Sequence, residues 1–159
     1  MNKNLTKEGF TMKFTTINEL QNFDFHDANI NGIRFSLDNL ILHLDNVKIL
    51  PTNTTNRDIR TMRTNNLFLT LEKASIIKFI NEGYKIYDPN GKLMSTVEDS
   101  PISEENYKKA FEDLASCTIN NIEQNDNIYT ISIDTEDHTY LLCVKCQRNL
   151  EDWDKYFNL

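Results

Sequence analysis

Glycine and proline are scarce in this chain, with four and three among 159 residues. Flexible linkers and low-complexity tracts are rich in these residues, so the composition indicates a single folded domain. We expect residues 1–12 to form a loose N-terminal extension and residues 13–159 to form one domain. A hydrophobic content of 39% is enough to build the core of a domain this long.

Long apolar runs are missing as well. No stretch holds the roughly 18 apolar residues that a membrane span requires, and the start of the chain has lysine but no hydrophobic signal-peptide core. Cysteine is limited to three residues, an odd number, which is not the pattern of a disulfide framework. These absences predict a cytoplasmic protein that does not associate with membranes.

The chain also lacks a strongly basic segment. Residues 51–92 carry seven basic against four acidic residues, a local charge of +3, which is too little to follow a nucleic-acid backbone. Residues 93–142 carry two lysines against eleven acidic residues, a local charge of −9. This acidic half is either a solvated face or a surface that attracts a basic protein partner. In the second case the expected binding residues are Glu98, Asp99, Glu104, Glu105, Glu112 and Asp113.

Alternation of apolar and polar residues predicts antiparallel strands along most of the chain. The expected strands and hairpins are residues 28–37, 39–50, 59–64, 67–80, 84–93, 127–134 and 138–146. Residues 15–23 indicate one or two helical turns, and residues 100–117 predict the one clear helix, with Ser103 as its N-cap. Residues 150–159 predict a short amphipathic helix that buries Trp153. The expected fold is α+β: a mostly antiparallel sheet of about seven to eight strands, one mid-chain helix and a short C-terminal helix.

A weak repeat joins two of the predicted hairpins. At a constant offset of 89, Ile30 and Ile33 correspond to Ile119 and Ile122, and the alternating residues 40–45 correspond to residues 129–134. Alternating strands match one another often by chance, so the pattern alone does not establish a duplication. A true duplication would imply two related β-hairpin halves joined by the long central segment.

The segment from Asp88 to Gly91 predicts a type I turn followed by a left-handed glycine, which closes a short hairpin. Tyr84 and Ile86 would then face one side of the hairpin, and Tyr87 the other. Tyr84 and Tyr87, together with Arg57, Arg60 and Arg63, are the expected contact residues for a protein or a sugar, because tyrosine and arginine dominate many interfaces. The alternative is a sheet face covered by long side chains.

His26 and Asp27 are the closest approach to a catalytic pair in the sequence. Neighbouring residues on a strand face opposite sides, so we expect Asp27 to bind backbone N–H groups and His26 to pack with one hydrogen bond. The sequence has no Gly-x-Ser-x-Gly motif and no glycine-rich phosphate loop. It therefore predicts a protein that is not an enzyme, and an acid/base role for this pair is the least favoured hypothesis.

Cys143 and Cys146 have the spacing of half a zinc site, for which Cys117 and His138 would have to supply the other ligands. Residues i and i+3 of a strand face opposite sides, and no helix begins after this pair to activate a thiolate. We therefore expect neither a metal nor a redox role, and no cofactor.

Three short motifs follow one another along the chain: GYKIYDPNG at residues 83–91, EDSP at residues 98–101 and DWDKY at residues 152–156. Together they resemble the bacterial family of subtilase cytotoxin B-subunit-like proteins. That family typically has a hairpin of the Gly-Tyr-x-Tyr-Tyr-Asp-x-x-Gly kind, a Pro-Asp-x-Pro segment, a helix and an aromatic Glu-Trp-Glu-x-Tyr-like end. Here the hairpin motif spans 83–91, the acidic segment spans 98–101 and the aromatic end spans 152–156, with Ile86 in place of the second tyrosine and Glu98 in place of the first proline. The resemblance covers most of residues 23–157 and implies a glycan-binding protein with an OB-like barrel that forms a ring.

The segment "FHDANI", residues 25–30, also resembles small cytosolic immunity proteins of bacterial toxin systems, which act by binding a toxin. That resemblance is looser and implies a protein partner. Our leading hypothesis is therefore a cytosolic, non-enzymatic binding protein, an immunity protein that neutralises a toxin with a basic surface. The second hypothesis is a carbohydrate-binding toxin component that uses Tyr84 and Tyr87.

Overall fold

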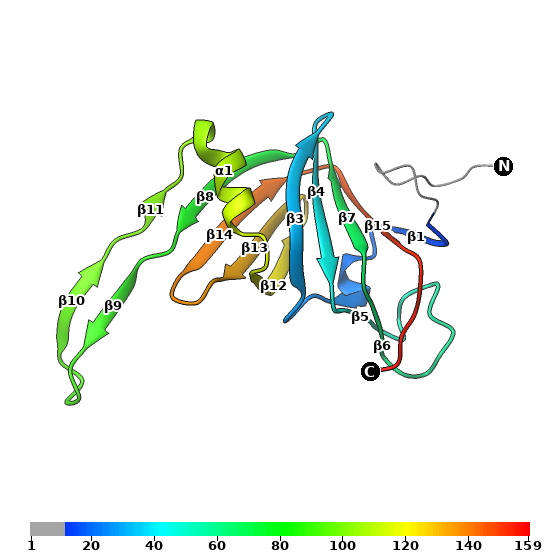
Figure 1. Cartoon of the computed structure of the whole chain (residues 1–159), viewed down its shortest axis with the longest axis horizontal. Helices are drawn as coiled ribbons and strands as arrows, with labels where there is room; N and C mark the ends of the chain where they lie inside the picture. Colours follow the sequence, from blue (N-terminus) through cyan, green and yellow to red (C-terminus); the bar gives the residue numbers. More distant parts are fainter. Residues whose placement is uncertain (1–11) are drawn as a thin grey trace.

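The computed structural model describes residues 12–159 (Figure 1), so the predicted N-terminal extension lies outside the described residues except for Met12. Strands make up 54% of the structure, and they are mostly antiparallel, as predicted. The strand count is higher than the seven to eight predicted. Over residues 12–159 the strands are β1 Phe14–Ile17, β2 Phe23–Asp24, β3 Asn29–Ser36, β4 Asn39–Asp45, β5 Val47–Ile49, β6 Met62–Thr64, β7 Leu67–Glu72, β8 Ser75–Asn81, β9 Tyr84–Tyr87, β10 Leu93–Val97, β11 Ser100–Pro101, β12 Thr118–Asn125, β13 Ile128–Asp134, β14 Thr139–Lys145 and β15 Arg148–Trp153.

Helical structure is limited to two short pieces in the described chain. A 3-10 turn, η1, covers Leu20–Asn22. The mid-chain helix begins as a 3-10 turn, η2, over Glu104–Asn106 and continues as α1 over Tyr107–Asp113, ten residues in all. The mid-chain helix was predicted correctly, although it is shorter than residues 100–117.

Ten of the strands form one open sheet in the order β1-β15-β7-β4-β3-β12-β13-β14-β8-β11. The sheet does not close into a barrel, so the OB-like barrel implied by the family resemblance is not the fold of this chain. β9 and β10 form a separate two-stranded ribbon, and β2, β5 and β6 form a small three-stranded sheet. Figure 1 shows the ribbon extending from one end of the molecule, far from the C-terminus.

Two of the predicted strands are broken where the backbone turns through a left-handed residue. The expected strand 39–50 divides into β4 and β5 at Asn46, which has a φ of 58°. The expected strand 67–80 divides into β7 and β8 at Lys73, which has a φ of 50°. The second break has the larger consequence, because β7 pairs with β4 and β15 while β8 pairs with β14 in the other half of the sheet.

The repeat with an offset of 89 corresponds to two equivalent hairpins. β3 and β4 occupy residues 29–36 and 39–45, and β12 and β13 occupy residues 118–125 and 128–134, the same bounds shifted by 89. The ladder of each hairpin is also interrupted at the same place, between Ile30 and Gly32 in one and between Ile119 and Asn121 in the other. The two hairpins are therefore equivalent in register as well as in length.

Backbone hydrogen bonds at the centre of the sheet, where β3 lies beside β12, are reciprocal. The N–H of Asp27 donates to the carbonyl of Ile119 (2.9 Å), and the N–H of Ser116, 89 residues after Asp27, donates to the carbonyl of Ile30 (2.8 Å). The N–H of Ile30 donates to Cys117 (2.9 Å), and that of Ile119 donates to Ala28 (2.9 Å). A pseudo-twofold axis therefore passes between β3 and β12, and we call these contacts the central junction.

The strands that follow each hairpin are related by the same symmetry, and in each half the last strand pairs with the opposite half of the sheet. β7 pairs with β4, and after residues 73–74 the chain crosses to place β8 beside β14. β14 pairs with β13, and after residues 146–147 the chain crosses to place β15 beside β7. Each half of the sheet is thus completed by the last strand of the other half.

The predicted C-terminal helix, residues 150–159, is wrong: the chain forms β15 and then an isolated bridge between Arg63 and Phe157. Burial along β15 alternates, and the buried side chains are Asn149, Glu151 and Trp153. Because two of these three residues are polar, their period of two could not be seen as a hydrophobic pattern. At the other end of the chain, the helical turns predicted for residues 15–23 are only η1, since β1 pairs with β15.

The core fills the inner face of the sheet. Leu40, Leu42 and Leu44 of β4 have no exposed surface, as the alternation predicted, but Ile41 is also buried, so β4 is covered on both faces. Trp153 has no exposed surface and contacts the ring of Phe23 with centroids 5.4 Å apart. The prediction that Trp153 is buried is therefore correct, although a strand and not a helix carries it.

Glu151 places a carboxyl group inside this core. Glu151 has no exposed surface, and one of its carboxyl oxygens accepts a hydrogen bond from Oγ1 of Thr16 (2.8 Å). Burial raises the pKa of Glu151 from its ordinary 4.5 to about 8, against the lowering effect of the Thr16 hydrogen bond. The neighbouring carboxylates of Glu19 and Asp152 raise it further. The group is therefore neutral in the folded protein around pH 6.

We expect Ala28→Leu to lower the free energy of unfolding by about 1–3 kcal/mol, because a side chain larger than Ala28, which has no exposed surface, overpacks the central junction. Urea unfolding measures this change. The matched control is Ala115→Leu, at a partly exposed position just after α1, with an expected change below about 0.5 kcal/mol. Equal effects of the two substitutions would contradict a tightly packed junction.

We expect Glu151→Gln to gain stability relative to wild type as the pH rises. The pKa of Glu151 is higher in the folded protein than in the unfolded chain. Its contribution to the free energy of unfolding is therefore fully present below pH 4.5 and is lost as the pH rises toward about 8. The difference between variant and wild type should change by at most about 1.4 kcal/mol per pH unit in that window. Urea unfolding at several pH values checks this, with exposed Glu123→Gln as the control. A difference that is independent of pH would show that Glu151 is ionised in the fold.

Candidate protein-binding surface

The mid-chain helix positions most of the predicted acidic residues. The apolar side chains of this helix face inward, and Phe111 and Leu114 are buried in the core. Ser103 occupies the N-cap with extended backbone, but its hydroxyl accepts a hydrogen bond from the side chain of Asn106 (2.8 Å) and not from a helix N–H. Inward packing of one face directs the acidic residues of the helix outward.

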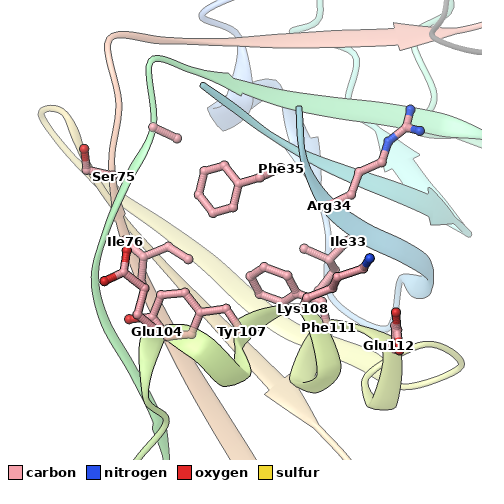
Figure 2. A pocket seen from close by; sticks show the side chains of 11 residues that line it. Ile33, Arg34, Phe35, Ser75, Ile76, Glu104, Tyr107, Lys108, Phe111 and Glu112 are labelled. Atoms are coloured by element: carbon pink, nitrogen blue, oxygen red, sulfur yellow. The ribbon is translucent and has the colours of Figure 1, made fainter. Parts of the chain in front are cut away.

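A groove runs between this helix, the end of β3 and the start of β8 (Figure 2). It has a volume of about 940 Å³. Its floor is aromatic and aliphatic, and Figure 2 shows the ring of Phe35 facing those of Tyr107 and Phe111 across the open space. Phe35 is 42% exposed, and its ring centroid lies 6.4 Å from that of Phe111. The groove can therefore accept an apolar side chain from a partner.

Charged side chains border the groove. Glu104 and Glu112 line it from the helix together with Lys108, and Arg34 lines it from β3. Two of the six predicted acidic binding residues therefore meet at a concave apolar surface. The sequence indicated the acids, but it did not indicate the groove, because Phe35 and Phe111 are 76 positions apart in the chain.

The other four predicted acidic residues differ in their surroundings. Glu105 is exposed on the helix, and Asp113 is exposed beside Lys109, with 3.4 Å between the ammonium nitrogen and a carboxylate oxygen. Glu98 is exposed just after β10. Asp99 has a structural task, because its carboxylate accepts a hydrogen bond from the N–H of Gly83 (2.7 Å). We therefore assign Glu98, Glu104, Glu105, Glu112 and Asp113 to the acidic surface and remove Asp99 from the predicted set.

The ribbon of β9 and β10, which we call the arm (residues 83–97), exposes every residue of both strands. Gly91 has a φ of 84°, and Asp88 accepts hydrogen bonds from the backbone of Asn90 and Lys92, so the predicted turn is confirmed. Cross-strand pairing places Tyr84 opposite Val97 and Tyr87 opposite Leu93. Tyr84 and Tyr87 therefore lie on opposite faces, as the alternation predicted.

The base of the arm depends on a close backbone approach at Gly83. A Cβ atom at this position would lie 2.1 Å from the carbonyl oxygen of Val97, a distance that no side chain can adopt. The hydrogen bond from Gly83 to Asp99 closes the same contact. Glycine at position 83 is thus required by the space available and not by its backbone angles.

Acidic side chains surround this base. Glu82, Asp134, Glu136 and Asp137 lie together where the arm meets the turn between β13 and β14. With Glu98 and Asp99 they form what we call the acidic rim. The sequence showed the excess of acidic residues here, but their convergence depends on β14 lying beside β8.

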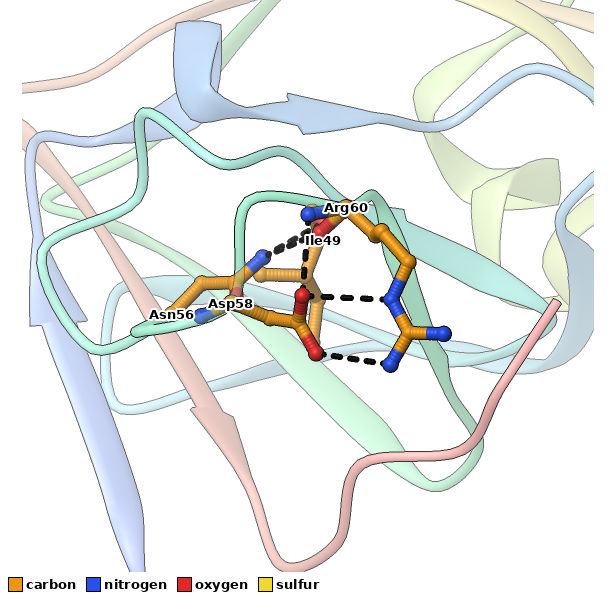
Figure 3. A network of polar contacts seen from close by, with 4 residues as sticks. All are labelled: Ile49, Asn56, Asp58 and Arg60. Carbon is orange, nitrogen blue, oxygen red and sulfur yellow. Dashed lines mark hydrogen bonds and ion pairs between the residues drawn. The ribbon is translucent and has the colours of Figure 1, made fainter.

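The predicted grouping of arginines with tyrosines is wrong. Arg60 forms a two-pronged ion pair with Asp58 within its own loop, and Asn56 joins this loop to the carbonyls of Ile49 and Arg60 (Figure 3). Hydrogen bonds from Arg60 hold the pKa of Asp58 below its ordinary value. The guanidinium of Arg63 lies 6.0 Å from the ring centroid of Phe157.

These arginines and the arm lie at opposite ends of the molecule (Figure 1). Arg57 belongs to the same loop as Arg60, whereas Tyr84 and Tyr87 stand on β9. The alternation within each strand gave no information about which strands lie at which end of the sheet. The arginines are therefore not part of the candidate surface.

The prediction that His26 and Asp27 point apart is also wrong. Asp27 has a φ of 66° and lies outside the strand, so Nε2 of His26 is 3.5 Å from a carboxylate oxygen of Asp27. Nδ1 of His26 is 2.7 Å from the carbonyl oxygen of Asn120, which is the single hydrogen bond we predicted. Both side chains are more than half exposed. The backbone of this segment forms the central junction, which gives the motif a structural task.

Cys143 and Cys146 bond to separate partners. Cys143 lies 3.8 Å from the hydroxyl of Thr130, and Cys146 is buried and contacts the carbonyl of Arg148. Burial raises the pKa of the Cys146 thiol to about 11, so it is protonated at neutral pH. Over residues 12–159, no group of three or more His, Cys, Asp or Glu side chains is placed to hold a metal ion.

Comparisons of the chain with protein-family models, with curated proteins and with solved structures give no significant match. In the described part of the chain no helix has the length and apolar character needed to cross a membrane. The function must therefore be inferred from the surface itself.

We expect Gly83→Ala to detach the base of the arm, because the added Cβ cannot fit beside Val97. Amide hydrogen exchange should become faster in residues 83–97 while the exchange of β12 to β14 stays unchanged. The matched control is Gly32→Ala, since a Cβ at Gly32 meets no atom within 4 Å. Unchanged exchange in the arm of the Gly83 variant would show that this contact does not hold it.

Proposed function

We propose that this protein is a non-enzymatic binding protein that neutralises a bacterial toxin, an immunity protein acting in the cytoplasm. The observation that supports this proposal most directly is the groove between α1, β3 and β8, which is apolar at its floor and bordered by acidic and basic side chains. An exposed apolar surface bordered by charges is typical of a protein-binding site. The looser resemblance of residues 25–30 to immunity proteins agrees with it.

The acidic surface supplies the second part of the proposal. Four of its carboxylates are exposed to solvent: Glu98, Glu104, Glu105 and Glu112. Their negative charges therefore attract a basic partner over a long range. A toxin with a basic surface would be steered toward the groove by these charges. An apolar side chain of the toxin would then enter the space beside Phe35 and provide the short-range affinity.

The carbohydrate-binding hypothesis has less support. Stacking against a sugar ring needs an aromatic face, and two tyrosines that share one ligand must lie on one side of the ribbon. Tyr84 and Tyr87 lie on opposite faces of the arm. His26 lines a groove of about 460 Å³, but Asp27 does not, so the two side chains do not converge on one space for a substrate and an enzymatic role has less support.

The test is a binding titration against the protein encoded directly upstream, which this proposal predicts to be a toxin with a basic surface, by stopped flow at low and high salt. Reversing Glu98, Glu104, Glu105 and Glu112 to Lys should slow association by at least about tenfold at low salt, because the steering charge changes sign. The same four residues changed to Gln should give an intermediate rate. Added salt should bring all three rates together.

Phe35→Ala tests the groove separately. It should raise the dissociation rate by about tenfold or more while leaving the association rate nearly unchanged, because it removes a short-range contact. The control is Ile59→Ser, at a position 92% exposed in the loop at the other end of the molecule. A charge-reversed protein that associates as fast as wild type, or a Phe35 variant with unchanged dissociation, would overturn the proposal. Binding to an array of sugars, without toxin binding, would favour the carbohydrate hypothesis.

A further inference from the structure

The arm contains six of the thirteen large apolar side chains that are exposed in the described chain. Six of its side chains are large, apolar and 42–67% exposed: Tyr84, Ile86, Tyr87, Leu93, Met94 and Val97. They cover both faces of the ribbon, so the arm does not pack against the body of the protein. Exposed apolar surface of this extent marks an interaction site.

A two-stranded ribbon is also marginally stable by itself in water. Among the described residues β9 and β10 pair only with each other, so each strand has one edge with unpaired backbone groups. Proteins usually protect such edges with charged residues, and β10, with the sequence LMSTV, has none. A second ribbon added to this edge would pair with the free backbone groups and bring apolar side chains of the two ribbons into contact along each face.

The charges of the arm and of its base are opposite in sign. The arm carries Lys85 and Lys92 against Asp88, whose carboxylate is already used by the turn. The acidic rim around the base consists of six carboxylates with no lysine or arginine. The surface is therefore self-complementary: the arm of one molecule suits the rim of another.

We propose that the arm mediates a symmetric dimer, in which the arms of two copies lie side by side in opposite directions. This arrangement brings the end of each arm, with Lys92, to the acidic rim of the other copy. It is isologous, so both copies use the same surface. The arm and the rim together comprise about 20 residues, the number that a standard interface of about 800 Å² per partner contains. The proposed dimer does not depend on toxin binding, which uses the groove of α1; of the acidic residues assigned to the two surfaces, only Glu98 belongs to both.

Two charge-reversed variants test this arrangement. Variant one carries Lys85→Glu with Lys92→Glu, which makes the arm acidic like the rim. Variant two reverses four of the six carboxylates of the rim, Glu82, Glu98, Glu136 and Asp137, to Lys, which makes the rim basic like the arm; all six side chains are exposed. In each variant the arm and the rim have charges of the same sign, so its own dimer should weaken by at least about tenfold. An equimolar mixture restores opposite charges in a mixed dimer, so dimers should form again.

Sedimentation velocity from about 1 to 100 µM measures the mass against the 18.6 kDa of one chain. We expect wild type to dimerise in this range, each variant to stay monomeric, and the mixture to dimerise. Tyr87→Ser with Leu93→Ser, a cross-strand pair on one face, should also give monomers, and Ile59→Ser should not.

Amide hydrogen exchange gives an independent measurement. The β10 amides should become slower to exchange as wild-type concentration rises, while those of β12 stay unchanged. A wild-type protein that is monomeric throughout, or a mixture that does not recover dimers, would overturn the proposal. A dimer that persists in the serine double variant would show that another surface holds it, which would overturn the assignment to the arm.

Discussion

Four reciprocal backbone hydrogen bonds at the central junction hold the two halves of this protein together. They join Asp27 and Ile30 on one side to Ser116 and Ile119 on the other, and the two left-handed residues, Asp27 and Ser116, have φ values of 66° and 73°. Left-handed backbone is tolerated best by short polar side chains such as these. The junction has few hydrogen bonds of its own, because β3 and β12 share only one register position. The exchange of β8 and β15 between the halves adds the long ladders that make it stable.

The candidate function depends on where the two halves differ. The segment before β12 contains η2 and α1, whereas the segment before β3 contains only η1. Each helical segment borders a groove against the hairpin strand of the other half. The groove of α1 is lined by Ile33 and Phe35 of β3, and the groove of η1 is lined by their equivalents in β12, Ile122 and Gln124. The groove beside α1 has about twice the volume, 940 against 460 Å³, and it alone has aromatic rings on both sides. A longer helix and one phenylalanine thus distinguish the candidate binding surface from the equivalent groove in the other half.

The hairpins, the mid-chain helix and the turn of the arm could be predicted from the sequence, because each is determined by residues that are close together in the chain. It failed at β15, where Asn149 and Glu151 occupy buried positions and remove the hydrophobic alternation. It also failed for strand order, since any alternating strand can pair with any other and only the crossing after Lys73 decides the partner of β8. For the candidate site, the sequence showed the excess of acidic residues but not the groove, which is built from residues far apart in the chain. It also could not show that Asp99 accepts a hydrogen bond from Gly83, because this contact depends on the folded backbone.

The same crossing explains why the arm and the acidic surface share one half. Because β8 lies beside β14, the chain leaves the sheet at its far edge and must return to begin β11 and the helix. The arm fills this excursion, and the acids of the β13–β14 turn lie beside its base. In the other half, β15 leads to the C-terminus and a bridge between Arg63 and Phe157, so no comparable excursion exists there within residues 12–159. A strand exchange that stabilises a symmetric sheet therefore places the candidate binding surface and the proposed dimer surface in the same half of the molecule.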